Sequence, residues 1–200
     1  MRIKSRWFKA EAPKSAEEIA GAAAFIVWRI AQNSLKTMRS ARFELAPGPQ
    51  YFAFLAEFLA FLTLGADRIA YRRGDDPWRV LFTTAIANRV GEILAENESG
   101  LLGAVPPGES KRRFVAMVNE CAVDCAGFEW GEDGPDFAFL RYLGHRVAEV
   151  MEPQDKTWAI SQVIEVEAPE AAATLRRGMA GLLDVTSRTR EREARAATGE

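Results

Sequence analysis

The segment Tyr51-Phe-Ala-Phe-Leu-Ala-Glu-Phe-Leu-Ala-Phe-Leu62 is apolar on nearly every side when it is projected as an α-helix. A helix of this kind is buried, so the segment predicts a central helix that runs from Gln50 to about Arg72. The rigid sequence Ala46-Pro-Gly-Pro49 separates it from the segment before it. We expect the rest of the chain to pack around this helix.

Signals for helix starts and ends flank the central segment. Ser15-Ala-Glu-Glu18 is a capping box, and it predicts a first helix that runs to about Arg39. After the central helix, Gly74-Asp-Asp-Pro77 combines a C-terminal glycine, an aspartate cap and a proline at the first helical position. A third helix should therefore begin at Pro77 and end near Asn97.

Four more helices are predicted in the second half of the chain. Their expected limits are Gly127 for the end of the fourth, Pro153 for the end of the fifth, about Asp155 for the start of the sixth, and Pro169 to about Asp184 for the seventh. The run Val163-Ile-Glu-Val166 could be a strand, but we assign it to a helix because no other segment has the alternating pattern of strands. The predicted fold class is all-α, a single-domain orthogonal or bundle-like array of about seven helices.

The length of 200 residues is sufficient for one domain with a substantial core. We expect a single helical domain over residues 1–184, in which residues 1–14 form a basic N-terminal arm. Residues 186–200 contain no aliphatic side chain larger than alanine, so they cannot bury an apolar face. Residues 185–200 are therefore predicted to be a polar tail, frayed or loosely helical.

The composition argues against several classes of partner. The formal net charge is −2, so the chain has no overall attraction for nucleic acid or for an anionic membrane. The local basic residues, which are too few for a strong site, are Arg2, Lys4, Arg6, Lys9 and Lys111-Arg-Arg113. The longest apolar run, Ile19 to Ile30, is interrupted by Arg29 and is shorter than the ~20 residues of a membrane span. We expect neither nucleic-acid binding nor a membrane span.

Cys121 and Cys125 lie four residues apart in a predicted helix. Their Cβ atoms would be about 5–6 Å apart, whereas a disulfide needs roughly 3.5–4.5 Å. We therefore expect reduced thiols that pack in the core, which is typical of a cytoplasmic protein. The neighbouring Glu120 and Asp124 should raise the thiol pKa values, which disfavours nucleophilic catalysis.

The remaining motifs give no catalytic site. The single histidine, His145, projects onto a polar helix face, and no Glu-x-x-His or His-x-x-x-His motif accompanies it, so we expect no metal. Glycine-rich phosphate loops and nucleophile elbows are absent from the sequence, and we expect no cofactor. The acidic loop around Trp130 is interpreted as solvated, with a basic partner as the alternative.

Two helices share a pattern that could be a relic of duplication. Phe82 is followed by Arg89-Val-Gly-Glu-Ile-Leu94, and Phe139 is followed at the same spacing by Arg146-Val-Ala-Glu-Val-Met151. In both, the arginine and the glutamate three positions later are within ion-pairing reach. Amphipathic helices also converge on such patterns, so the sequence leaves both explanations open.

The most informative polar residues are on the central helix, where Glu57, Asp67 and Arg68 share one arc with small residues. This arc can be a seam where another helix packs closely and the charges are paired. Alternatively, a partly buried Glu57 lines an aromatic pocket that includes Phe61, and burial raises its pKa. The candidate ligand-binding residues are therefore Glu57, Phe61, Asp67 and Arg68.

Phe25 and Trp28 lie at or near the charged face of the first helix, which suggests an interface between copies of the chain. Because apolar helices abound and convergent catalytic groups are absent, we expect a non-enzymatic module for protein interaction or assembly, such as a homodimer. The alternatives are a small-molecule or lipid-binding protein with an aromatic pocket and, after it, an enzyme that uses Glu57 as acid or base.

Overall fold

The computed structural model describes residues 14–72, 75–103 and 106–198, and it describes side chains up to residue 184. Most of the predicted basic arm, with Arg2, Lys4, Arg6 and Lys9, thus lies outside the described residues, as does the predicted capping glycine Gly74.

The protein is an all-α single domain, as predicted. Its elements are α1 (Ala16–Ser40), α2 (Pro49–Tyr71), α3 (Asp76–Leu102), α4 (Glu109–Asp124), α5 (Phe137–Val150), α6 (Lys156–Gln162), the π-helical turn η2 (Val163–Glu167) and α7 (Ala168–Thr198). None of the helices in the described residues has the length and apolarity to cross a membrane.

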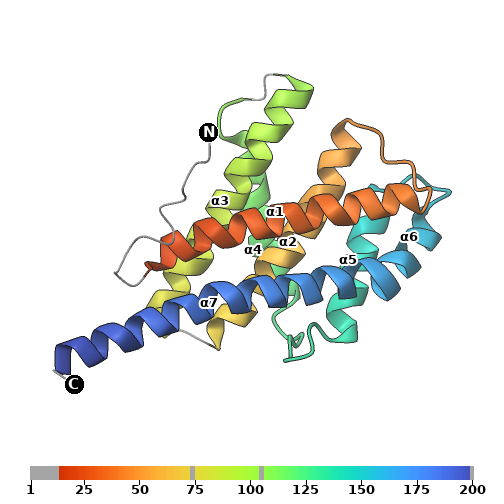
Figure 1. The fold of residues 1–200 in the computed structure, drawn as a ribbon. Helices are drawn as coiled ribbons and strands as arrows, with labels where there is room; N and C mark the ends of the chain where they lie inside the picture. The colour runs from red at the N-terminus through yellow and green to blue at the C-terminus, as the bar shows by residue number, and fades with distance from the viewer. Residues whose placement is uncertain (1–13, 73–74, 104–105, 199–200) are drawn as a thin grey trace.

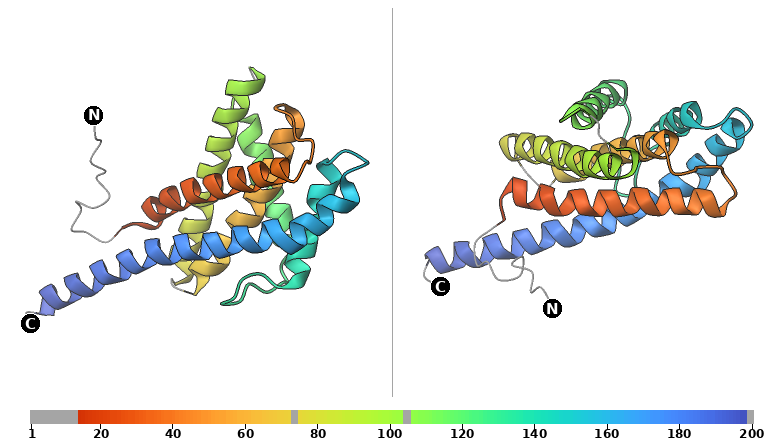
Figure 2. Two further views of the ribbon diagram at one scale, coloured as in Figure 1. Left: turned by 45° about the vertical axis from the view of Figure 1, so that its right-hand side comes forward. Right: turned by 90° about the horizontal axis from the view of Figure 1, so that it is seen from above.

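The helices are arranged around α2. Seen from above, α1 and α7 lie side by side on one side of the molecule, α2 and α3 lie in the middle, and α4 and α5 lie on the other side (Figure 2). Every residue of α2 from Phe54 to Asp67 is buried, and the helix packs against α1, α3, α4, α5 and α7. The prediction of a central, buried helix is therefore confirmed.

Local signals set several boundaries as predicted. Ser15 and Glu18 form the reciprocal capping box that begins α1. The Asp75 carboxylate accepts a hydrogen bond from the amide of Trp78 at 2.8 Å, so this aspartate caps α3. The predicted end of this helix near Asn97 is wrong, because α3 continues to Leu102 and stops where Gly103 adopts a φ of 88°.

The loop before α5 is less exposed than the sequence suggested. Trp130 is 5% exposed and packs against the rings of Phe61 and Phe139. Its indole lies directly on Gly65 of α2, where an added Cβ would be only 2.4 Å from the ring. The interpretation of this loop as merely solvated is wrong for Trp130, because an indole ring buries a large apolar area against the aromatic residues of α2 and α5.

The predicted break between a sixth and a seventh helix is also wrong. The segments α6, η2 and α7 follow one another without a gap, and α7 continues to Thr198, beyond the helices beside it (Figure 1). The amide of Ala168 donates to the carbonyl of Val163, five residues earlier. Pro169 has no N–H to continue an α-helical ladder, and the wider π turn accommodates it without ending the helix. Residues 163–166 are thus helical, as assigned.

Candidate ligand-binding groove

The polar residue at the centre of α2, Glu57, is only 6% exposed. Arg146 of α5 donates to both of its oxygens, from Nε to Oε2 and from Nη2 to Oε1, at 2.9 Å each. Burial raises the pKa of Glu57, and the hydrogen bonds from Arg146 oppose that rise. Neither carboxylate oxygen is left without a partner.

The other two charges on this arc are also satisfied by neighbouring segments. Asp67 accepts two hydrogen bonds from Arg79, at 2.8 and 2.9 Å, and one from the Thr83 hydroxyl at 2.5 Å. Arg68 donates to the carbonyl of Cys125 at 3.0 Å. The arc therefore has the geometry of the seam that the sequence suggested, in which the charges pair with other elements.

A hollow of about 340 Å³ adjoins Glu57, with Phe52, Phe114 and the ion-paired Glu98 and Arg113 among its lining residues. The predicted pocket residue Phe61 is not part of this wall. It is 3% exposed and packs in the aromatic cluster with Trp130 and Phe139.

The two halves of the possible repeat use their arginines differently. Arg89 pairs with Glu92 at 3.1 Å, as the spacing predicted. Arg146, at the equivalent position, pairs with Glu57 of α2. The shared pattern therefore does not extend to shared contacts, although Phe82 and Phe139 are both buried.

The two predicted interface residues differ in exposure. Phe25 is 53% exposed, and the Arg89 guanidinium lies over its ring at 5.4 Å. Trp28 is 8% exposed and belongs to the hydrophobic core. Trp28 is thus not available to a second copy in this structure, because it faces α1's packing partners rather than solvent.

The remaining reactive side chains are placed as expected. Cys121 and Cys125 are free and buried, and burial raises the pKa of Cys125 to about 12. Burial is the largest cause, and the neighbouring Asp124 adds to it. His145 is exposed on α5. Lys111, from the second basic stretch, is ion-paired with Glu92.

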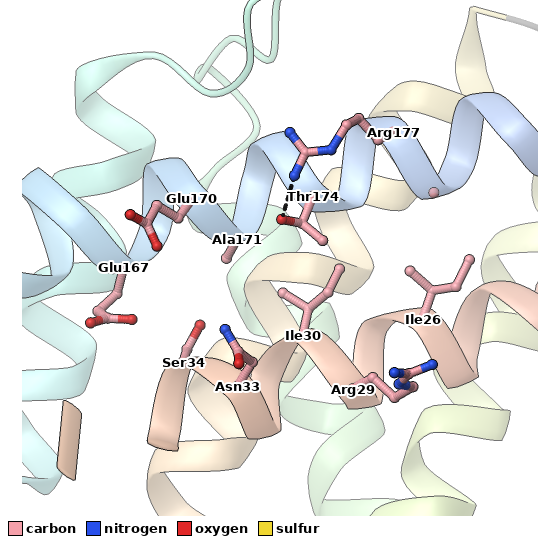
Figure 3. A pocket seen from close by; sticks show the side chains of 11 residues that line it. Ile26, Arg29, Ile30, Asn33, Ser34, Glu167, Glu170, Ala171, Thr174 and Arg177 are labelled. Carbon is pink, nitrogen blue, oxygen red and sulfur yellow. Dashed lines mark hydrogen bonds between the residues drawn. The ribbon is translucent and has the colours of Figure 1, made fainter. Parts of the chain in front are cut away.

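A larger hollow of about 560 Å³ lies between α1 and α7, far from the predicted site on α2 in sequence (Figure 3). We call it the α1–α7 groove. It is lined by Ile26, Arg29, Ile30, Asn33, Ser34, Glu167, Glu170, Ala171, Thr174, Arg177 and Gly178.

Glu167 is the distinctive side chain of the groove because it is only 2% exposed. Its Oε1 accepts a hydrogen bond from the Gln162 side chain at 3.0 Å, whereas Oε2 has no hydrogen bond from any residue that the structure describes. Burial raises the pKa of Glu167, and the nearby charge of Glu170 raises it further. Oε2 of this carboxylate can therefore accept a hydrogen bond from a molecule in the groove.

The position of Glu167 along its helix explains why this glutamate is buried. Val163, Glu167, Ala171 and Leu175 follow one another at intervals of four residues, and all four are buried. Glu167 thus occupies a position on an otherwise apolar stripe. It is the last residue of the π turn, a feature that is common at functional sites.

The groove has two chemically different ends. At one end, Glu167 and Glu170 face Ser34 and Asn33 of α1 (Figure 3). Ser34 is 3% exposed, and its hydroxyl has no hydrogen-bond partner among the described residues. The opposite end is basic and apolar. Arg29 lies there beside Ile26 on α1, and Arg177 lies across the groove on α7 with its guanidinium turned back to Thr174; Ile30 lies between the two ends (Figure 3).

Sequence reasoning missed Glu167 and Ser34, although each left a signal. Both interrupt a stripe of apolar residues at helical spacing, Glu167 between Val163 and Ala171, and Ser34 between Ala31 and Met38. A polar residue at such a position is buried once the helix packs, and it then needs a partner. The signal is weak alone, since many such residues find that partner within the chain.

No family model, characterised protein or solved structure matches this chain.

Proposed function

We propose that this protein is a non-enzymatic binding protein for a small organic molecule, which occupies the α1–α7 groove. The observation that carries the proposal is the free Oε2 of Glu167, a side chain that is 2% exposed and lines a hollow of about 560 Å³. Oε2 is not among the buried side-chain atoms that lack a partner in the described part of the chain, so it opens onto the groove. A ligand that donates a hydrogen bond to this oxygen would take the place of water there.

The lining favours binding over catalysis. Among the described residues of the lining, Glu167 is the single buried titratable residue, and neither cysteine nor histidine occurs. A carboxylate without a nucleophile or a second proton-transfer group can hold a ligand, but the usual acid–base arrangements need a further group. The α1–α7 groove thus favours the ligand-binding alternative over an enzyme that uses Glu57, both of whose oxygens are occupied by Arg146.

A role in protein assembly is the second candidate, and the course of α7 favours it. This helix extends beyond the helices packed against it (Figures 1 and 2), and such a projection suits a contact with another chain. A chain ending at Asp184 tests this role by light scattering. A change from a dimer to a monomer would support assembly, and a monomer in both chains would remove this candidate.

Reduced, buried thiols support our placement of the protein in the cytoplasm.

The ligand-binding proposal is tested by thermal shift with a panel of small amines, carboxylates, amino acids and neutral compounds. The comparison is between the wild-type chain and Thr174→Trp, which fills the α1–α7 groove from an exposed position. Thr84→Trp is the matched control, because Thr84 is an exposed helical threonine that does not line the groove.

We expect at least one class of compound to stabilise the wild type and the Thr84→Trp variant but not the Thr174→Trp variant. Stabilisation follows from ligand binding to the folded state alone. The proposal is wrong if no compound stabilises the wild type, or if stabilisation persists in full when the groove is filled.

A further inference from the structure

The two ends of the α1–α7 groove carry opposite charge, and this arrangement specifies a ligand class. We propose that the groove binds a linear amino carboxylate with an apolar middle, its ammonium group held by Glu167 and its carboxylate by Arg29 and Arg177. This inference rests on the proposed function and adds the identity of the ligand class.

The acidic end is suited to an ammonium group. The free Oε2 of Glu167 accepts one donor, Glu170 supplies a second carboxylate, and the unpaired hydroxyl of Ser34 supplies a further acceptor. An ammonium group has three donors and no acceptor, which suits a lining whose polar groups at this end are acceptors from two helices. A carboxylate ligand would be repelled at this end by Glu167 and Glu170.

The basic end is suited to an anionic group because its arginines are not consumed by ion pairs. Arg29 has no ion pair with any residue in the described part of the chain. Arg177 donates to the neutral Thr174 hydroxyl at 3.1 Å, an interaction that leaves its charge uncompensated (Figure 3). Each guanidinium is therefore open to a carboxylate, with which guanidinium forms paired hydrogen bonds.

The spacing of the two ends sets the length of the ligand. Glu167 and Thr174, the residue to which the Arg177 guanidinium is hydrogen-bonded, are seven residues apart, which corresponds to about 10 Å along a helix axis. Ile30 lies between the ends, so the middle of the ligand contacts apolar surface. An extended tripeptide spans about 10 Å, and so does an ω-amino acid of similar chain length. Both sources share the chemistry of an ammonium and a carboxylate at this separation.

Calorimetric titration of the full chain tests the inference with five probes. The probes are 8-aminooctanoate, trialanine, the short 4-aminobutanoate, and the single-charge compounds octylamine and octanoate. We expect 8-aminooctanoate or trialanine to bind at least tenfold more tightly than 4-aminobutanoate and octanoate. A preference for trialanine identifies a short peptide as the natural ligand, and a preference for 8-aminooctanoate identifies a non-peptide amino acid.

Two variants test the assignment of the ends. Glu167→Gln should weaken the best probe at least tenfold, whereas Glu165→Gln, an exposed change in the same π turn, should not. The double variant Arg29→Gln with Arg177→Gln should weaken the best probe at least fivefold and leave octylamine unchanged. Arg141→Gln, on the exposed face of α5, is its control.

The outcomes separate this inference from the proposed function. Equal binding of octylamine and 8-aminooctanoate would overturn the two-ended ligand while leaving a groove that binds amines. Failure of all five probes, together with another compound class whose effect is lost in Thr174→Trp, would overturn the inference and retain the binding function.

Discussion

Two buried glutamates of this protein have opposite surroundings. Glu57 in the middle of the molecule receives a bidentate guanidinium, so both of its oxygens are paired. Glu167, at the end of the π turn, is also buried, but it receives one amide hydrogen bond, and its Oε2 has no partner among the described residues. Burial of a carboxylate alone does not mark a functional site. The free oxygen is what distinguishes the α1–α7 groove from the seam on α2.

The largest expected effect is at Glu57, whose two oxygens are both paired with Arg146. Glu57→Gln leaves the Arg146 guanidinium without its anionic partner, and we expect a loss of about 3 kcal/mol in the free energy of unfolding. This value lies in the lower part of the usual range for a broken buried ion pair because the Arg146 side chain is 25% exposed. Urea unfolding measures the loss. Glu149→Gln, an exposed glutamate of α5, should stay within about 0.5 kcal/mol of wild type. Equal effects of the two changes would show that the pair is not structural.

The packing of α2 against Trp130 is tested at Gly65. An alanine Cβ there would lie 2.4 Å from the Trp130 ring, and we expect a loss of about 2 kcal/mol from overpacking. Gly21→Ala is the control, since no atom lies within 4 Å of an added Cβ on α1. Removal of a helical glycine should there stabilise the protein by up to about 1 kcal/mol. Thermal unfolding of both variants checks the contrast, and a stabilised Gly65→Ala variant would contradict it.

These contrasts show what the sequence could predict. The central helix followed from its all-round apolar pattern, and the start of α1 followed from a local capping box, so neither required knowledge of distant contacts. The seam on α2 was also foreseen, but its partners were not. Arg146 lies 89 residues from Glu57 in the sequence. Glu149, three residues after Arg146 on the same helix, is an equally plausible partner for this arginine when only the sequence is known.

The α1–α7 groove could not be predicted because it depends on how two helices far apart in sequence meet. The sequence predicts a helix start at Pro169, since prolines are common at the first helical position. In the structure the π turn carries the helix through this proline and places Glu167 on the buried stripe. The π turn packs against α5 and α1, and these contacts with distant segments are not visible in the local sequence.

A smaller effect on the free energy of unfolding is expected at the caps of α5 and α6. Asp136 accepts hydrogen bonds from the amides of Phe139 and Glu129 and begins α5, the helix that supplies Arg146 to Glu57. Asp136→Ala should cost about 1 kcal/mol. Asp155 begins α6 without a side-chain cap, so Asp155→Ala should cost less than about 0.5 kcal/mol. Chemical denaturation distinguishes the two, and equal losses would contradict the assigned caps.

The smallest effect, and one of opposite sign, is expected for Glu167→Gln. Burial raises the pKa of Glu167 above its ordinary value of 4.5, so the folded protein binds this proton more tightly than the unfolded chain does. The stability linked to that proton is complete below the ordinary pKa and is lost as the pH rises through the folded-state pKa. A glutamine at this position does not ionise, and its side-chain oxygen can still accept the hydrogen bond from Gln162.

The Glu167→Gln variant should therefore melt slightly above wild type at neutral pH, and this advantage should disappear in acid, as measured by thermal unfolding at several pH values. Glu165→Gln, at an exposed position in the same turn, should show no such trend. A Glu167→Gln variant that is much less stable at neutral pH would place Glu167 with Glu57 as a structural carboxylate.

The most direct test of the contrast is to locate a bound probe by amide chemical shifts during a titration of the isotopically labelled protein with 8-aminooctanoate. The expected shifts concentrate at Ser34 and Arg29 of α1 and at Ala171 and Thr174 of α7, with none around Glu57. Shifts centred on Glu57, or none at all at millimolar probe, would contradict this expectation.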